Sequence, residues 1–127
     1  MQADIKGPQR KILTASVRPL KAAHGTQGIA VRGGRSLPFV VSREWSAPAG
    51  YYSEQWFLVK DDGEVIYEAP AEIRLIWGLQ SRTEFADTVE APIALEPGKY
   101  QIVFALDRLR GGEIEVTAAE APAEEAA

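Results

Sequence analysis

Few residues of this chain could act as a nucleophile, a base or a metal ligand. His24 is the single histidine, and cysteine is absent from all 127 residues. A serine or threonine nucleophile needs a positioned base, and His24 lies in the loop-like stretch Ala22–Gly28 with no Gly-x-Ser-x-Gly motif beside it. Thiolate chemistry, disulfides and cysteine-ligated zinc are excluded by composition. We therefore expect a protein that is not an enzyme and has no metal or other cofactor, with His24 as an incidental surface residue.

Two short motifs imitate ligand-binding loops. The run Asp61-Asp62-Gly63-Glu64 resembles part of a calcium loop, but such a loop needs about 12 residues with alternating oxygen ligands. The glycines between Gly25 and Gly34 lack both the lysine-containing phosphate-binding series and the Gly-x-Gly-x-x-Gly series. Both stretches are typical of turns.

The most suggestive surface is the aromatic segment Arg43–Trp56, which carries a Pro/Gly loop between its aromatic residues. Trp45, Tyr51 and Tyr52 are the candidate binding residues, because aromatic rings with a polar tip are favoured at interfaces and stack on sugars. In the alternative interpretation, Trp45 and Trp56 are core residues that close one end of the fold, and one tyrosine anchors the loop. The sequence favours this alternative, because Trp45 continues the apolar face of the preceding strand.

Period-two alternation of apolar residues predicts the elements that position these side chains. Tyr100–Leu106 and Ile114–Val116 form one predicted hairpin, joined through a Gly-Gly turn region. Trp56–Lys60 and Val65–Tyr67 form a second hairpin across Asp62-Gly63, a pair that adopts the positive φ angles of a tight turn.

Four further strands are predicted from shorter patterns. The residues on one face of each strand are, in chain order, Leu13, Ala15 and Val17; Leu37, Phe39 and Val41; Ile73, Leu75 and Trp77; and Phe85 and Val89. Pro38 places the second of these near a sheet edge or a strand start, and Pro19–Gly34 before it is predicted to be loop. Pro70–Gln80 has a helical alternative that begins at Pro70, but a short Ile- and Trp-rich run broken by Gly78 favours a strand.

Seven or eight short strands without a convincing long helix indicate an all-β, two-sheet antiparallel sandwich. The length fits one domain, predicted over residues 1–117, in which residues 1–10 are allowed as a mobile arm. Residues 118–127 contain only Ala, Glu and Pro. They offer no large apolar side chain to offset the entropy of ordering, so we predict a disordered acidic tail.

One turn carries a resemblance to a known class of domain. The run Leu95-Glu-Pro97-Gly98-Lys-Tyr100 resembles the Leu-x-Pro-Gly-x-Tyr turn and strand before the final hairpin of bacterial immunoglobulin-like and transthyretin-like sandwiches, over Ala91–Val116. The resemblance implies an immunoglobulin-like fold in which the tyrosine hydroxyl bonds back to the turn backbone. It implies little about function, because such sandwiches serve adhesins, carriers, virion components and cytoplasmic proteins.

Charge and hydropathy restrict the partners. Residues 1–35 have a balance of +6, which leaves −10 for the remainder and −4 overall. An acidic domain is a poor polyanion binder, which disfavours a nucleic-acid partner. No apolar run approaches the roughly 20 residues of a membrane span, and no secretory signal is visible. We expect a soluble, cytoplasmic protein with no membrane partner, unless a leader has been removed.

Two functions remain open from the sequence. The first is a non-enzymatic interaction or assembly module, such as a cytoplasmic or virion accessory protein, that self-associates or binds an unknown protein. The alternative is a carbohydrate- or small-ligand-binding module that uses Trp45, Tyr51 and Tyr52 of the inter-strand loop.

Overall fold

The computed structural model describes residues 9–22 and 26–122, so His24, most of the predicted arm and residues 123–127 lie outside it. Every regular element in the described ranges is a β-strand: β1 (Lys11–Pro19), β2 (Ile29–Arg32), β3 (Arg35–Ser36), β4 (Phe39–Ser46), β5 (Gly50–Lys60), β6 (Val65–Glu68), β7 (Glu72–Ile76), β8 (Thr83–Val89), β9 (Gly98–Leu106) and β10 (Leu109–Glu120). Within these ranges no helix is long and apolar enough to cross a membrane.

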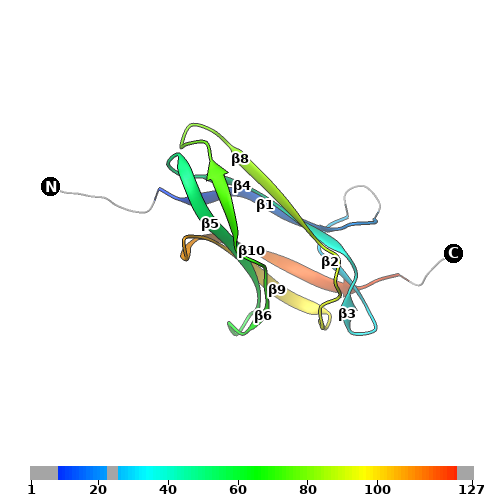
Figure 1. Cartoon of the computed structure of the whole chain (residues 1–127). Coiled ribbons are helices and arrows are strands. Elements are labelled where there is room, and N and C mark those ends of the chain that lie inside the picture. The colour runs from blue at the N-terminus through cyan, green and yellow to red at the C-terminus, as the bar shows by residue number, and fades with distance from the viewer. Residues whose placement is uncertain (1–8, 23–25, 123–127) are drawn as a thin grey trace.

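The strands form two sheets, as Figure 1 shows. The smaller sheet has the order β1-β4-β8, and the larger has the order β3-β2-β10-β9-β5-β6, with β7 also pairing with β5. The larger sheet curls toward a half-barrel. The prediction of an all-β protein with two sheets is confirmed. The predicted count of seven or eight strands is too low, because the described residues form ten.

The core lies between the two sheets. Alternate residues of β5 point into it, so that Trp56 is buried against Phe39 of the opposite sheet, with ring centroids 6.5 Å apart. Trp56 also contacts Tyr67 of β6 at 5.6 Å between ring centroids. The period-two alternation in the sequence therefore identifies which side chains of the longest inner strands are buried.

Both predicted hairpins are present, but the turn between β9 and β10 is not the Gly-Gly pair. The chain reverses at Asp107 and Arg108, whose φ angles are 50° and 69°. Gly111 lies instead in a bulge of β10, where an added Cβ would come within 2.3 Å of the Trp45 ring. Gly111 is therefore needed for packing over Trp45, and Gly112 lies against Ile12, so neither glycine forms the turn.

The β5–β6 turn lies at the predicted Asp62-Gly63 pair, but only Gly63 of the two has a positive φ angle. Gly63 has a φ of 93° and donates its N–H to Lys60 O at 2.9 Å. Asp62 Oδ1 accepts from the Glu64 N–H at 2.9 Å, which is the local side-chain bond that favours Asp in turns.

Two predictions fail where β2 meets β10. The predicted loop Pro19–Gly34 contains β2, whose Ile29 and Val31 are buried. The predicted tail does not begin at Ala118, because β10 continues to Glu120 and pairs in parallel with β2. Ala118 is buried there, so main-chain pairing and a small apolar side chain replace the large side chains whose absence suggested disorder.

The first strand departs from its predicted face. A register shift between Ile12 and Thr14 leaves Leu13 exposed, while Ala15 and Val17 keep the inward phase. A bulge of this kind reverses the phase of one residue and cannot be read from alternation alone.

The remaining strand predictions hold. Pro38 directly precedes β4. β8 spans the predicted Phe85–Val89 pattern. The segment Pro70–Gln80 contains the strand β7 and no helix.

Candidate functional site

The three predicted binding residues do not share a surface. Trp45 is fully buried in β4, and its indole N–H donates to Glu54 Oε2 at 2.8 Å. Tyr52 is buried on β5, and its hydroxyl donates to Pro48 O at 2.6 Å. Tyr51 alone points to solvent. This is the arrangement of the alternative interpretation, in which the tryptophan belongs to the core and one tyrosine anchors the loop.

The loop before β5 enters the strand through a tight corner. Gly50 has a φ of 153°, and an added Cβ would contact the Tyr52 ring at 3.9 Å. The Arg10 guanidinium lies over this ring, with Cζ 5.1 Å from the ring centroid, in a cation–π contact. Tyr52 is therefore held from several sides and serves the fold.

Beneath this corner, four charged side chains from both sheets meet. Arg43 of β4 and Glu54 of β5 are buried and form a bidentate pair, with Nε to Oε2 at 2.7 Å and Nη2 to Oε1 at 2.5 Å. Asp87 of β8 accepts from Arg43 Nη2 at 3.1 Å. Arg74 of β7 bridges the two carboxylates, at 3.3 Å to Glu54 and 2.9 Å to Asp87. We call these four residues the inter-sheet ion cluster; its formal charges cancel.

Aromatic side chains enclose the ion cluster. The Trp56 indole N–H donates to Asp87 Oδ2 at 2.9 Å. Phe85 lies against both guanidinium groups, with its centroid 5.8 Å from Arg43 Cζ and 4.8 Å from Arg74 Cζ. Buried charges are tolerated only when they are paired and hydrogen-bonded, and this enclosure supplies both conditions.

The Asp87 carboxyl has a perturbed pKa. Burial by itself raises this pKa, but the hydrogen bond from Trp56 and the charges of Arg43 and Arg74 outweigh burial, so the pKa lies below its ordinary value of 3.8. Asp87 is therefore a carboxylate at neutral pH, and both its oxygens already accept hydrogen bonds. Within the described residues, no group of three or more potential ligands could hold a metal ion. This geometry ties the two sheets together and leaves no base poised for proton transfer.

An apolar surface lies on the outer side of β5 and β7. Tyr51, Ile73 and Trp77 are 73%, 71% and 67% exposed, and the register places Tyr51 opposite Leu75 and Ser53 opposite Ile73. Trp77 is held at the end of the strand because its N–H donates to Thr83 Oγ1 at 3.1 Å. We call Tyr51, Ile73, Leu75 and Trp77 the β5–β7 face; Leu79 adds a further exposed apolar side chain nearby in sequence.

Sequence reasoning placed the β7 members of this face on one side of a strand but did not identify that side as exposed. β7 carries Ile76 on its other side, so hydropathy does not distinguish the faces. Glu54 was the residue of the sequence that could have shown which side of β7 is buried, because it alternates in phase with the buried residues of β5. A buried carboxylate requires an inward cation, and Arg74 in the neighbouring strand supplies it.

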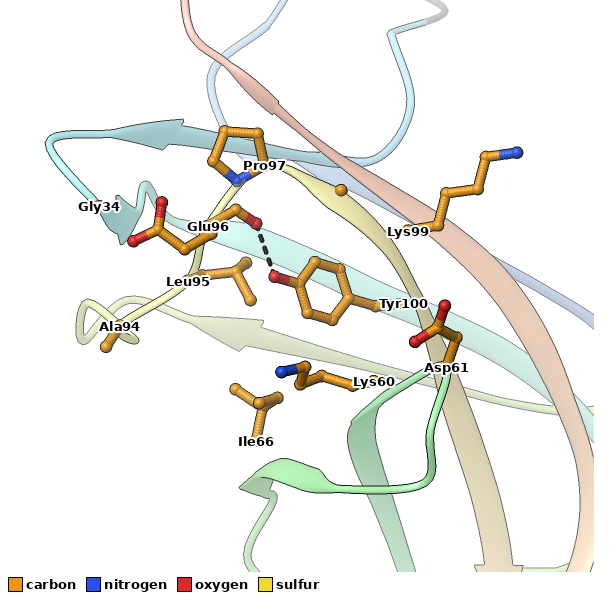
Figure 2. A pocket seen from close by; sticks show the side chains of 11 residues that line it. Gly34, Lys60, Asp61, Ile66, Ala94, Leu95, Glu96, Pro97, Lys99 and Tyr100 are labelled. Carbon is orange, nitrogen blue, oxygen red and sulfur yellow. Dashed lines mark hydrogen bonds between the residues drawn. The ribbon is translucent and has the colours of Figure 1, made fainter.

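A second corner, at Tyr100, lies at the other end of the larger sheet from Tyr52, because β5 and β9 are antiparallel. Figure 2 shows this corner from close by. Tyr100 donates its hydroxyl to Glu96 O at 2.6 Å, as the resemblance to immunoglobulin-like domains implies. An open pocket of ≈ 430 Å³ adjoins it, with Ile66 and Leu95 among its apolar residues and Lys60 and Asp61 among its charged ones. Its mixed charges do not point to one class of ligand.

Comparisons with known proteins give no family. No protein-family model matches the chain, and no curated protein matches its sequence. Among solved structures, the chain is similar to part of the Pseudomonas fluorescens alkylpurine DNA glycosylase AlkC bound to DNA containing an abasic site analog, with 17% identity and a TM-score of 0.48, covering 89% of this chain and 31% of that one. It is also similar to part of a β-glucosidase from Listeria innocua in complex with isofagomine, with 10% identity and a TM-score of 0.43, covering 84% of this chain and 16% of that one. Similarity at this level carries no argument about function.

Proposed function

We propose that this protein is a non-enzymatic assembly module, built on an immunoglobulin-like sandwich, that self-associates through the β5–β7 face. One observation carries the proposal: Tyr51, Ile73 and Trp77 expose most of their side chains on a single sheet face. Single exposed apolar residues are ordinary, but a contiguous group of this kind marks an interaction surface.

The composition of this face supports a second copy of the chain as the partner. The outward neighbours on β5 are Ser53 and Gln55, and Arg74 of β7 points inward, so neither strand places a charged side chain on this face. The carboxylate of Asp107 borders it, where it accepts a hydrogen bond from the Ser53 N–H. With a net charge of −4, two copies repel over much of their surfaces. They can meet at an uncharged face without placing like charges in contact, and a two-fold interface uses the same patch twice.

Two further features support this proposal: one supports the immunoglobulin-like fold, and the other supports a non-enzymatic function. The tyrosine corner at Tyr100 and the buried Trp56 between the sheets match the expectations for an immunoglobulin-like domain. In the inter-sheet ion cluster, both carboxylates are already engaged by arginine and tryptophan donors.

Light scattering coupled to size exclusion, over a wide range of protein concentrations, tests self-association. We expect a dimer that dissociates on dilution, and we expect Trp77→Lys to shift it toward monomer. Loss of a central aromatic contact typically costs about 2 kcal/mol or more, which raises the dimer dissociation constant about thirtyfold.

Val65→Lys is the matched control, because Val65 is an exposed apolar residue of β6 outside the β5–β7 face. This variant should remain dimeric. A wild-type protein that is monomeric at every concentration would overturn the proposal, as would equal dissociation of both lysine variants.

A carbohydrate-binding function is the second candidate, because Tyr51 and Trp77 are exposed aromatic side chains on the same sheet face. Glycans should then change tryptophan fluorescence, and Tyr51→Ala should abolish the response without lowering the melting temperature. Self-association predicts no such response. The two functions therefore separate in one pair of measurements.

A further inference from the structure

A groove opens beside β8, where no main-chain pairing of the described residues joins the two sheets. It has a volume of ≈ 360 Å³ and runs between the C-terminal half of β8 and the segment that links β6 to β7. Asp87 and Val89 form the wall on the β8 side, and Tyr67, Ala69 and Pro70 are among the lining residues from the other sheet. The lining therefore combines apolar and aromatic side chains with Thr88 and three carboxylates, and no lysine or arginine is among the described residues that line it.

The strand that borders this groove has a free edge. β8 is the last strand of its sheet and, within the described residues, pairs only with β4. Its seven residues, Thr83–Val89, include neither proline nor lysine, two residues that commonly block edge pairing. Asp87 points inward but is neutralised by Arg43 and Arg74, so it does not repel an added strand.

The groove has a negative rim. Glu72 and Glu90 both line it, and neither forms an ion pair with any residue in the described part of the chain. The partly exposed Asp87 carboxylate lines the same groove. The aromatic ring of Tyr67, packed against Trp56, lines the same space. Unpaired carboxylates beside an aromatic ring favour a cationic side chain.

We propose that an extended segment of another protein adds as a fourth strand along β8 and places a lysine or arginine side chain in this groove. Main-chain hydrogen bonds to the free edge supply affinity, as in other cases of strand addition. Side chains of the added strand that share the phase of Phe85, Asp87 and Val89 point between the sheets. One of these positions takes the cation, and the outward positions face solvent beside Ala86 and Thr88.

This site is independent of self-association, because it uses the opposite face of β7 and the edge of the other sheet. The two proposals are separated by measuring peptide binding on both the wild type and the Trp77→Lys variant. Equal binding by the two proteins is expected, whatever their oligomeric state.

The test uses a synthetic peptide, acetyl-Thr-Val-Thr-Lys-Thr-Val-Thr-amide, and an otherwise identical peptide with norleucine in place of lysine. Binding is followed by amide chemical shifts of the ¹⁵N-labelled full chain. The lysine peptide should shift amides of β8 and of residues 67–72, and the norleucine peptide should bind more weakly. A version of the lysine peptide with N-methylated edge amides should lose binding, because it cannot form the ladder.

A double variant, Glu72→Gln with Glu90→Gln, tests the negative rim of the groove. The control is Glu84→Gln, which removes a carboxylate from the exposed outer side of β8. The double variant should weaken lysine-peptide binding about five- to thirtyfold, and the control should not. Equal affinity for the lysine and norleucine peptides would overturn the proposal. So would undiminished binding of the N-methylated peptide, shifts confined to other strands, or an equal effect of Glu84→Gln.

Discussion

The corners Pro48–Tyr52 and Glu96–Tyr100 have the same local structure at opposite ends of the molecule. In each, a glycine with a φ of 153° is followed two residues later by a tyrosine. The tyrosine hydroxyl donates to the carbonyl four residues back, at 2.6 Å in both cases. The corners lie at opposite ends because β5 and β9, which they introduce, are antiparallel neighbours.

The surroundings of the two corners differ. The first lies over the inter-sheet ion cluster and beside the β5–β7 face, whereas the second lies over apolar residues such as Ile102 and Leu95 and beside a pocket of mixed charge. The comparison teaches that corner chemistry sets how a strand enters the sheet. What each end can bind is set by side chains from other elements.

The largest expected difference concerns the core beneath each corner. Glu54→Gln removes the charge that pairs with Arg43 and Arg74, which leaves two cations with one remaining carboxylate. We expect it to lower the free energy of unfolding by about 3–5 kcal/mol, measured by denaturant titration. Ile102→Val, at the apolar end, should cost only about 0.5–1.5 kcal/mol. Equal losses would show that the ion cluster is no more sensitive than the apolar core.

The second largest effect is a pH-dependent loss of stability, expected only at the end of the molecule that holds the inter-sheet ion cluster. The pKa of Asp87 is lowered on folding, so its contribution is present above the ordinary value of 3.8 and is lost as the pH falls through the lowered value. Asp87→Asn should cost about 1–3 kcal/mol at neutral pH, the value of hydrogen bonds to a charged group. Denaturant titrations in acid should show this cost shrinking. A difference from wild type that is independent of pH would contradict the assignment.

The smallest effect should be the same at both ends. Tyr52→Phe and Tyr100→Phe each remove one hydroxyl donor while they leave the ring in place. Each should lower the free energy of unfolding by about 1 kcal/mol. Thermal and denaturant unfolding would show whether the two values agree. If one variant is neutral, its corner is held by neighbouring contacts instead of by the hydroxyl.

Much of the fold follows from local rules that the sequence displays. Alternation predicts both hairpins and the strand character of β7, and the Leu-x-Pro-Gly-x-Tyr run predicts the hydroxyl bond of Tyr100. The missed strand β2 and the misplaced start of the tail have a common cause. Ile29 and Ala118 join a parallel pair between distant segments, and neither segment has a pattern that reveals its partner.

The surfaces were less predictable than the strands. Of the predicted site residues Trp45, Tyr51 and Tyr52, only Tyr51 is exposed. The sequence could not distinguish them, because tyrosine and tryptophan occur with the same strand pattern in a core and on a surface. The sequence also predicted a strand that includes Trp77, but it did not predict that the Trp77 side chain is exposed. The groove beside β8 depends on segments of both sheets, which a single-strand pattern cannot bring together.

The parallel pair of β2 and β10 also bears on the order of folding. Residues 29–31 leave the ribosome well before their partners, residues 118–120, because the two segments are far apart in the sequence. Long-range pairing of this kind forms late and slowly, because a large loop must close before any contact is gained. The nascent chain can form the β5–β6 hairpin early, whereas Ile29 and Val31 remain uncovered on the β10 side until β10 has left the exit tunnel.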